Sequence, residues 1–217
     1  MTSTSPATAP PKKRLTTSAM IASFADPGQR TTSAPFGHAL ARLAEERPEI
    51  VGLSADLAKY TDMHIFREAH PDRFFQMGMA EQSMLGAAAG MAEVGLVPFA
   101  STYSVFATRR AYDFLCLDIA EPNLNVNIVG ALPGLTTGYG PSHQATEDVA
   151  ILRACPNLTI VDPCDAVTSS RPSRSWPSTQ ARPTCGCCAA RCPRCWTSTT
   201  IGSSSARPRN CAPAATS

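Results

Sequence analysis

Short apolar runs alternate with amphipathic segments between residues 33 and 166 of the 217-residue chain. Continuous apolar runs are typical of strands buried on both faces, whereas apolar residues three and four positions apart indicate helices. The apolar runs predict five strands, at 50–53, 74–77, 97–100, 124–129 and 158–161. The amphipathic segments predict helices beside them, at 33–47, 62–69, 81–94, 105–119 and 147–153.

Two of these helices carry further local signals. Ser33 can cap the first helix, Pro35 is tolerated in its first turn, and Pro48 ends it. In the helix at 105–119, we expect four side chains on the inner face, those of Phe106, Tyr112, Leu115 and Ile119.

The alternation of strands and helices with short connections predicts an α/β fold, in which helices cover both faces of a parallel sheet. Ligands of such sheets bind at the carboxyl ends of the strands. Residues that could bind a ligand or take part in a reaction follow the first four strands, namely Asp56, Glu81, 101–103 and the Gly-rich loop 131–143. We therefore expect a single site at this edge of the sheet.

The N-terminal residues 1–32 are rich in Ser, Thr and Pro and predict a flexible leader. No apolar stretch in the chain approaches the ~20 residues of a membrane span, and no apolar segment of signal-peptide length follows the leader's basic residues. Cys116, Cys155 and Cys164 show no disulfide framework and fit a reducing cytoplasm. The net charge of +2 does not indicate a nucleic-acid or membrane partner.

The composition changes abruptly near residue 167. All 17 acidic residues lie at or before Asp165, whereas residues 167–217 hold seven Arg, no Lys and no acid. The same tail contains six of the nine Cys residues. The domain predicted by the regular pattern therefore covers 33–166, and 167–217 is a basic, Cys-rich, low-complexity tail for which we expect irregular structure.

Three interpretations of the tail remain. Cys187 or Cys188 with Cys192 and Cys195 has the spacing of a zinc site. The basic charge also fits a disordered arm. We favour a third interpretation, translation of a GC-rich gene in the wrong reading frame, because such frames yield Arg, Pro, Ser, Ala, Cys and Thr without acids or Lys.

A tight turn at Gly78 leads into a helix whose first turn contains Glu81. A carboxylate at this position is usually a favourable partner of the helix dipole. The surrounding Gly78-Met79-Ala80-Glu81-Gln82, however, resembles the Gly-x-Ala-Glu-Gln turn of the thiamine diphosphate enzymes of the transketolase family. The resemblance covers about residues 35–166 and implies the pyrimidine-binding domain of the thiamine diphosphate-binding fold.

The resemblance implies a catalytic role for Glu81, whose carboxyl group would bond a ring nitrogen of the cofactor's aminopyrimidine. A proton held there activates the cofactor, and a mostly apolar pocket favours sharing of that proton. The segment from Ser101 to Arg109 matches the family's aromatic segment, so Tyr103 and Phe106 are the residues expected to stack on the ring. The alternative is that these two are ordinary core residues.

The run Gly138-Tyr139-Gly140-Pro141-Ser142-His143-Gln144 resembles the family's Gly-x-x-Gly-Pro-x-His-Gln loop. The resemblance implies that His143 is catalytic and moves protons at substrate oxygens, which suits the titration range of histidine. Tyr139 stands where transketolases have an Asp that contacts a substrate hydroxyl. This departure puts the usual sugar specificity in question.

Two further residues are assigned to the cofactor by the resemblance alone. Asp56, in Ser54-Ala55-Asp56-Leu57, corresponds to a residue that faces the cofactor in relatives, although a turn at the strand end explains it nearly as well. Arg109 stands where many members have another aromatic residue beside the cofactor.

The family binds the diphosphate through a metal held by a Gly-Asp-Gly segment and a later Asn, and this chain has no such segment. The resemblance therefore implies a split enzyme. A diphosphate-binding N-terminal subunit would bring the diphosphate site and a Mg or Ca ion, and thiamine diphosphate would lie between the subunits of a homo- or hetero-oligomer.

The function implied is transfer of a two-carbon ketol unit between sugar phosphates by a cytoplasmic transketolase. The Glu turn also occurs in 1-deoxy-D-xylulose-5-phosphate synthase and in the beta subunits of 2-oxoacid dehydrogenases, so these activities are alternatives. A further alternative is a truncated, non-catalytic chain that only binds a partner subunit.

Overall fold

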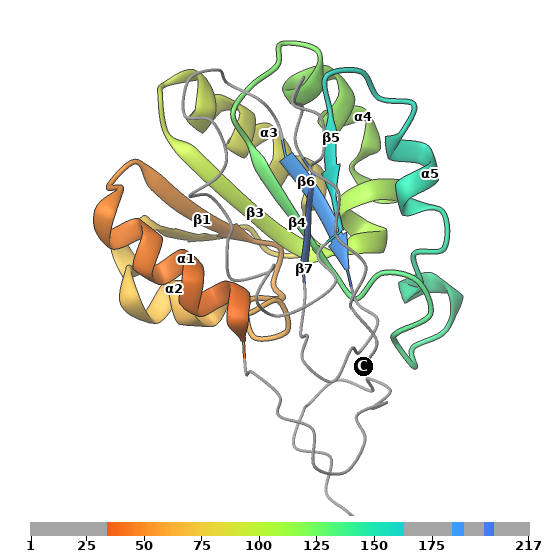
Figure 1. Cartoon of the computed structure of the whole chain (residues 1–217), viewed down its shortest axis with the longest axis horizontal. Coiled ribbons are helices and arrows are strands. Elements are labelled where there is room, and N and C mark those ends of the chain that lie inside the picture. Colours follow the sequence, from red (N-terminus) through yellow and green to blue (C-terminus); the bar gives the residue numbers. More distant parts are fainter. Residues whose placement is uncertain (1–33, 163–183, 189–197, 202–217) are drawn as a thin grey trace, which may run out of the picture.

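The structure, a computed structural model, describes residues 34–162, 184–188 and 198–201. Its centre is a sheet with the strand order β2-β1-β3-β4-β6-β5-β7 (Figure 1). The first four positions of the sheet are parallel pairs, as predicted. The strands are β1 (Ile50–Ser54), β2 (Phe74–Gln76), β3 (Val97–Tyr103), β4 (Asn127–Ala131), β5 (Thr159–Val161), β6 (Thr184–Cys188) and β7 (Ser198–Ile201).

Helices connect the strands, and short irregular turns adjoin them. The α-helices are α1 (Pro35–Glu46), α2 (Met63–Ala69), α3 (Glu81–Glu93), α4 (Tyr112–Phe114) and α5 (Asp148–Leu152). Two 3₁₀ turns, η1 (Pro71–Arg73) and η4 (Pro141–His143), and two π-helical segments, η2 (Phe106–Arg110) and η3 (Leu115–Ala120), complete the described elements.

Helices cover both faces of the sheet, as the near-continuous apolar strands predict (Figure 1). On one face α1 and α2 pack on the strands, with Phe36, Leu40 and Phe66 among the buried side chains. On the other face α3 and the 106–120 segment form a second core. Alternate residues of a strand point to opposite faces, so in β3 Phe99 joins the first core and Ala100 the second.

Except for the helix at 105–119, the predicted elements between residues 34 and 162 are present, with some shifted bounds. β3 extends to Tyr103, so residues 101–103 form the end of the strand instead of the loop that follows it. β4 begins at Asn127, three residues later than predicted. The cap predicted at Ser33 lies outside the described residues.

The helix predicted at 105–119 is wrong in type, because two π-helical segments flank a short α-helical turn. Four of the five fully buried apolar side chains here recur every four residues, at Ala107, Ala111, Leu115 and Ile119, and the fifth is Ala120. An α-helix would rotate such a row off the sheet, whereas wider turns keep it on one face. Leu115 and Ile119 are buried as predicted, but Phe106 is only half-buried.

The tail, for which we expected irregular structure, contributes β6 and β7 beside β4 and β5. β6 runs parallel to β4, and β7 runs antiparallel to it. The open edge of β4 has unpaired backbone groups that an extended segment can satisfy, and the Ser-Thr-Thr-Ile sequence of β7 favours a strand. The flexible leader and the rest of the tail lie outside the described residues. Within the described part of the chain, no helix is long and apolar enough to cross a membrane.

Gly37 allows α1 to approach the loop before α2. A Cβ atom placed on Gly37 would lie 2.3 Å from the carbonyl oxygen of Asp62, whereas a Cβ on Gly90 in α3 would meet nothing within 4 Å. We therefore expect Gly37→Ala to lower the free energy of unfolding by about 1–3 kcal/mol, because α1 must shift. Gly90→Ala should raise it by roughly 0.5–1 kcal/mol through helix propensity. Urea unfolding of both variants tests this, and equal effects would contradict the close approach.

Burial raises the pKa of Asp62 from 3.8 to about 7. The folded state holds the Asp62 proton more tightly than the unfolded state does. Protonation of Asp62 therefore contributes to the free energy of unfolding in full below pH 4, and this contribution is lost as pH rises through 7. We expect Asp62→Asn to match the wild type at pH 4 and to be more stable at pH 8, by up to about 4 kcal/mol. Urea unfolding at the two pH values measures this. The exposed Asp72→Asn is the control, and a parallel pH response of Asp62→Asn and wild type would refute the prediction.

Candidate active site

Glu81 lies at the first position of α3, at the carboxyl edge of the parallel strands. The chain turns sharply before it, with Gly78 at a φ of 71°, a conformation that favours glycine. The Glu81 side chain is only 1% exposed. Its Oε1 accepts a hydrogen bond of 3.3 Å from the Thr102 hydroxyl, and its Oε2 accepts one of 2.7 Å from Nη1 of Arg110. A buried carboxylate requires such partners, because it has lost its hydration.

Arg110 was not singled out by the sequence analysis as a site residue. It comes from the π-helical segment η2, and its guanidinium lies over the Phe106 ring, 4.1 Å from the centroid. This geometry is a cation–π contact. Because its side chain is 41% exposed, Arg110 links the buried carboxylate to the surface. The signal available in the sequence was the pair of basic residues Arg109-Arg110 a few positions after the predicted strand at 97–100.

Aromatic rings gather beside this ion pair at the ends of β3 and β4. Tyr103 is buried and stacks on Phe106, with centroids 6.0 Å apart and an interplanar angle of 20°. Tyr60 packs edge-on against Tyr103 at 6.4 Å. Burial, and then the nearby Tyr139 and Tyr60, raise the pKa of Tyr103 to about 12, so its hydroxyl stays neutral at physiological pH.

His143 ends the 3₁₀ turn η4, which follows Gly140 at a φ of 84°. Its imidazole meets the Phe106 ring nearly at right angles, with centroids 5.2 Å apart, and lies 5.2 Å from the Tyr139 ring. The Ser142 hydroxyl lies 2.9 Å from Nδ1 of His143. The structure therefore brings His143 to the aromatic cluster, as the sequence predicted for a residue at this edge.

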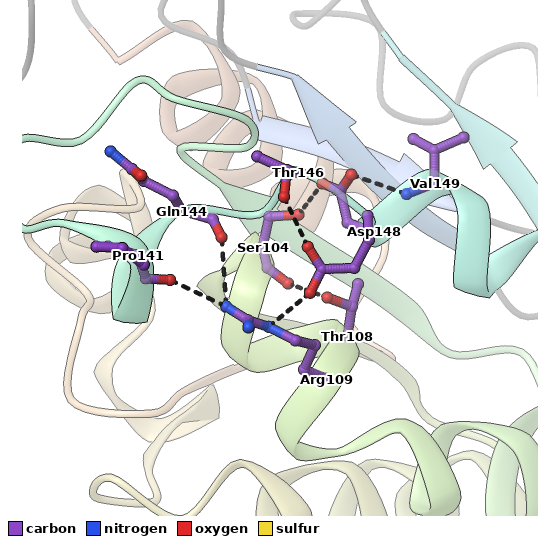
Figure 2. A network of polar contacts seen from close by, with 9 residues as sticks. Ser104, Thr108, Arg109, Pro141, Gln144, Thr146, Asp148 and Val149 are labelled. Atoms are coloured by element: carbon purple, nitrogen blue, oxygen red, sulfur yellow. Dashed lines mark hydrogen bonds and ion pairs between the residues drawn. The ribbon is translucent and has the colours of Figure 1, made fainter.

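Figure 2 shows the polar contacts that join η2 to the loop before α5. Nη2 of Arg109 donates to the carbonyl oxygens of Pro141 at 3.2 Å and Gln144 at 3.3 Å, and Nε lies 2.9 Å from Oε1 of Glu147. The Thr146 hydroxyl and the Arg109 guanidinium lower the pKa of Glu147, so this carboxylate is charged at neutral pH.

Asp56 is also at the carboxyl edge, in a left-handed conformation with a φ of 59° after β1. Its backbone N–H donates to Oε1 of Gln76 at 2.8 Å, and its carboxylate accepts a weaker bond from the same side chain. These contacts tie the end of β1 to the end of β2. They fit the turn interpretation, and the cofactor role of Asp56 stays a prediction.

The contacts thus connect four predicted residues, Glu81 through Arg110 to Phe106, and Phe106 to Tyr103 and His143. A buried acid, a flat aromatic face and an imidazole together suit a cationic or heteroaromatic ligand and proton transfer beside it. Within the described residues, no group of three or more His, Cys, Asp and Glu could hold a metal ion. Cys192 and Cys195 of the zinc hypothesis lie outside these residues.

Comparison with known proteins places this site in a family context. Residues 28–175 match the family described as transketolase, pyrimidine binding domain. The chain is 70% identical over 155 residues to a putative uncharacterized transketolase family protein of Sinorhizobium fredii, and the match covers 71% of this chain and 45% of the relative. It is 44% identical over 131 residues to a putative transketolase C-terminal section of Methanocaldococcus jannaschii, covering 60% of this chain and 42% of the relative.

Among solved structures, the chain is similar to a split gene transketolase described as an inactive beta4 tetramer. The TM-score is 0.55 at 45% sequence identity, and the match covers 63% of this chain and 44% of the other. The chain therefore spans less than half the length of these relatives.

The ion pair between Glu81 and Arg110 should stabilise the chain more than a surface pair does. We expect Arg110→Gln to lower the free energy of unfolding by about 1–3 kcal/mol, because it leaves a buried carboxylate without its charged donor. Glu81→Gln should cost less, since Arg110 keeps contact with water. The loss in the double variant should be smaller than the sum of the single losses.

The pair Arg47–Glu49 is a matched control, since its N–O distance is also 2.7 Å but both side chains are 34% exposed. Its coupling energy in urea unfolding should fall below about 1 kcal/mol. Equal coupling energies for the two pairs would contradict a special contribution from burial.

Proposed function

The chain belongs to the transketolase family through its pyrimidine binding domain, and from this premise we propose that it is the pyrimidine-domain subunit of a thiamine diphosphate-dependent transketolase. Such an enzyme moves a two-carbon ketol unit between sugar phosphates. The observation that carries the proposal is the buried carboxylate of Glu81, which Arg110 joins to the ring of Phe106 at the carboxyl edge of the sheet. A mere helix-capping acid would have no need of burial or of a charged donor.

The residues at this edge fit the pyrimidine half of the cofactor. Thiamine diphosphate, when bound, supplies the carbanion chemistry that breaks and forms the carbon–carbon bond. The carboxylate oxygens of Glu81 keep lone pairs with which to hold a proton at a ring nitrogen of the aminopyrimidine. Phe106 and Tyr103 would line the ring and keep water away from it.

Arg110 occupies one face of Phe106 and one oxygen of Glu81. Its guanidinium is flat and cationic, and its contact with Phe106 supports the proposal that this ring face binds a flat, cationic group. We infer that Arg110 yields the Phe106 face when cofactor enters, which its 41% exposure permits.

His143 would move a proton at a substrate oxygen, since its imidazole lies beside the same ring. Because the Tyr103 hydroxyl is neutral, it would add no negative charge beside the reacting atoms. Tyr139 is 41% exposed and lies against His143, so it would meet the substrate where other transketolases offer an acidic residue.

We propose that a diphosphate-binding N-terminal subunit completes the site and carries the Mg or Ca ion. The relative from Methanocaldococcus jannaschii is described as a C-terminal section, and the similar solved structure as an inactive tetramer of a split gene product. Both descriptions support a requirement for a second chain. We extend this to a hetero-oligomer in which the cofactor lies between the two subunits.

The test is ketol transfer and thiamine diphosphate binding by the chain mixed with the N-terminal subunit from the same genome. Glu81→Gln should lower kcat by roughly 10²–10⁴-fold, since the ring nitrogen loses its proton partner. Glu93→Gln, at the exposed far end of the same helix, is the matched control and should keep full activity. Wild-type rates for Glu81→Gln would refute the proposed role.

The same assay includes a variant whose reading frame is restored after residue 167. Activity of the restored variant alone would identify the 217-residue chain as a truncated form that at most binds its partner. Failure of cofactor binding in both, with the partner present, would overturn the proposed function.

A further inference from the structure

Three separate contacts from the Arg109 side chain reach the segment 141–147 (Figure 2), which includes His143. Arg109 donates through Nη2 to the carbonyl oxygens of Pro141 and Gln144, and through Nε to the carboxylate of Glu147. The two carbonyls lie on either side of His143 in the sequence. The guanidinium therefore bridges the turn before and after the imidazole.

Besides Arg109, two backbone hydrogen bonds between Gly134 and Ala145 and a bond of 3.2 Å from Nε2 of Gln144 to the carbonyl of Thr137 hold the loop after His143. The turn that carries His143 is short. η4 is only three residues long, and its closing hydrogen bond runs from the N–H of His143 to the carbonyl of Gly140. Gly140, at a φ of 84°, directly precedes the turn and leaves the backbone permissive there. An arginine suits this task because its planar fork presents several donors in fixed directions, so little freedom is lost for each bond formed.

A second contact joins the residues just before η2 to the start of α5. The Ser104 hydroxyl donates to Oδ2 of Asp148 at 2.6 Å, and both side chains are buried. Phe106 lies between Ser104 and Arg109 in the sequence, and its ring lies 5.2 Å from that of His143. The contacts of Ser104 and of Arg109 thus lie on either side of Phe106 in the sequence, and Arg109 makes the more exposed ones.

We propose that Arg109 is a positioning residue that seats His143 against Phe106. It acts through the backbone on both sides of the imidazole, in contrast to the cofactor contact that the family resemblance suggested for it. The placement of His143 is independent of the proposed function, whereas its consequence for proton transfer rests on that function.

Loss of Arg109 should change the position of His143 more than the stability of the whole fold. The side chain of Arg109 is 45% exposed and that of Glu147 38% exposed, so their ion pair alone contributes little to global stability. The two contacts to the carbonyls of Pro141 and Gln144 act differently, because they order the backbone on both sides of His143 and so restrict where its side chain can lie. Loss of Arg109 should therefore displace His143 while the sheet and its two cores stay folded.

The first experiment records the imidazole ¹H–¹³C NMR signals of the full chain, which contains four His residues. His143→Asn assigns the His143 signal. In Arg109→Gln the ring-current shift imposed on this signal by the neighbouring rings of Phe106, Tyr103 and Tyr139 should change, and the other three signals should stay in place. Arg109→Lys keeps the charge but cannot span the three acceptors, so it should give an intermediate displacement.

Two further variants sharpen the result. Glu147→Ala removes the ion pair and leaves both carbonyl contacts, so it should displace the His143 signal in the same direction and by less. Arg153→Gln, at the exposed end of α5, is the matched control and should change nothing. An unshifted His143 signal in Arg109→Gln would overturn the proposal, and so would shifts of all four signals in both Arg109→Gln and Glu147→Ala, because they would show an effect on the whole fold.

The second experiment measures steady-state kinetics with the N-terminal subunit. Arg109→Gln should lower kcat by roughly tenfold to a hundredfold through misplacement of His143, with cofactor affinity unchanged and partial rescue in Arg109→Lys. A loss of cofactor affinity with unchanged kcat would instead make Arg109 a cofactor ligand and refute the positioning role. If no variant or wild type transfers a ketol unit, the proposed function fails, while the NMR result still decides where His143 lies.

Discussion

The burial of one charge, the Glu81 carboxylate, organises the carboxyl edge of this sheet. A side chain that is 1% exposed must obtain from the protein the hydrogen bonds it no longer has from water. Thr102 supplies one from the end of β3, and Arg110 supplies the charged one from η2. Because Arg110 also lies on Phe106, the neutralised carboxylate and the aromatic cluster form one connected unit.

The parallel sheet explains why these groups meet. All parallel strands end at the same edge, so Glu81 after β2, Thr102 in β3 and the loop after β4 converge although they are far apart in the sequence. Helices on both faces hold the strands in two apolar cores, which leaves this edge as the place for polar chemistry. The architecture thus separates stability, in the cores, from function, at the strand ends.

The π-helical turns of the 106–120 segment serve both needs at once. Their wider turns keep a four-residue apolar row on the sheet, from Ala107 to Ile119. At the amino-terminal end they direct two adjacent arginines to different partners, Arg110 to the buried carboxylate and Arg109 to the His143 turn. π-helical turns often occur at functional sites, where a local change of pitch redirects side chains.

The sequence by itself determined the parallel α/β architecture, the position of Glu81 at the start of a helix and the gathering of Tyr103, Phe106 and His143 at one edge. The architecture and the helix start follow from the hydrophobic period and from the alternation of strands and helices along the chain, which are local or nearly local properties. Tyr103, Phe106 and His143 were identified by the family resemblance of the motifs that contain them. Only the tertiary structure decided that Arg110 forms an ion pair with Glu81 and that Arg109 donates hydrogen bonds to the loop around His143. The reason is that an arginine's partner depends on helix pitch and on groups 29 to 38 positions away, about which the local pattern carries no information.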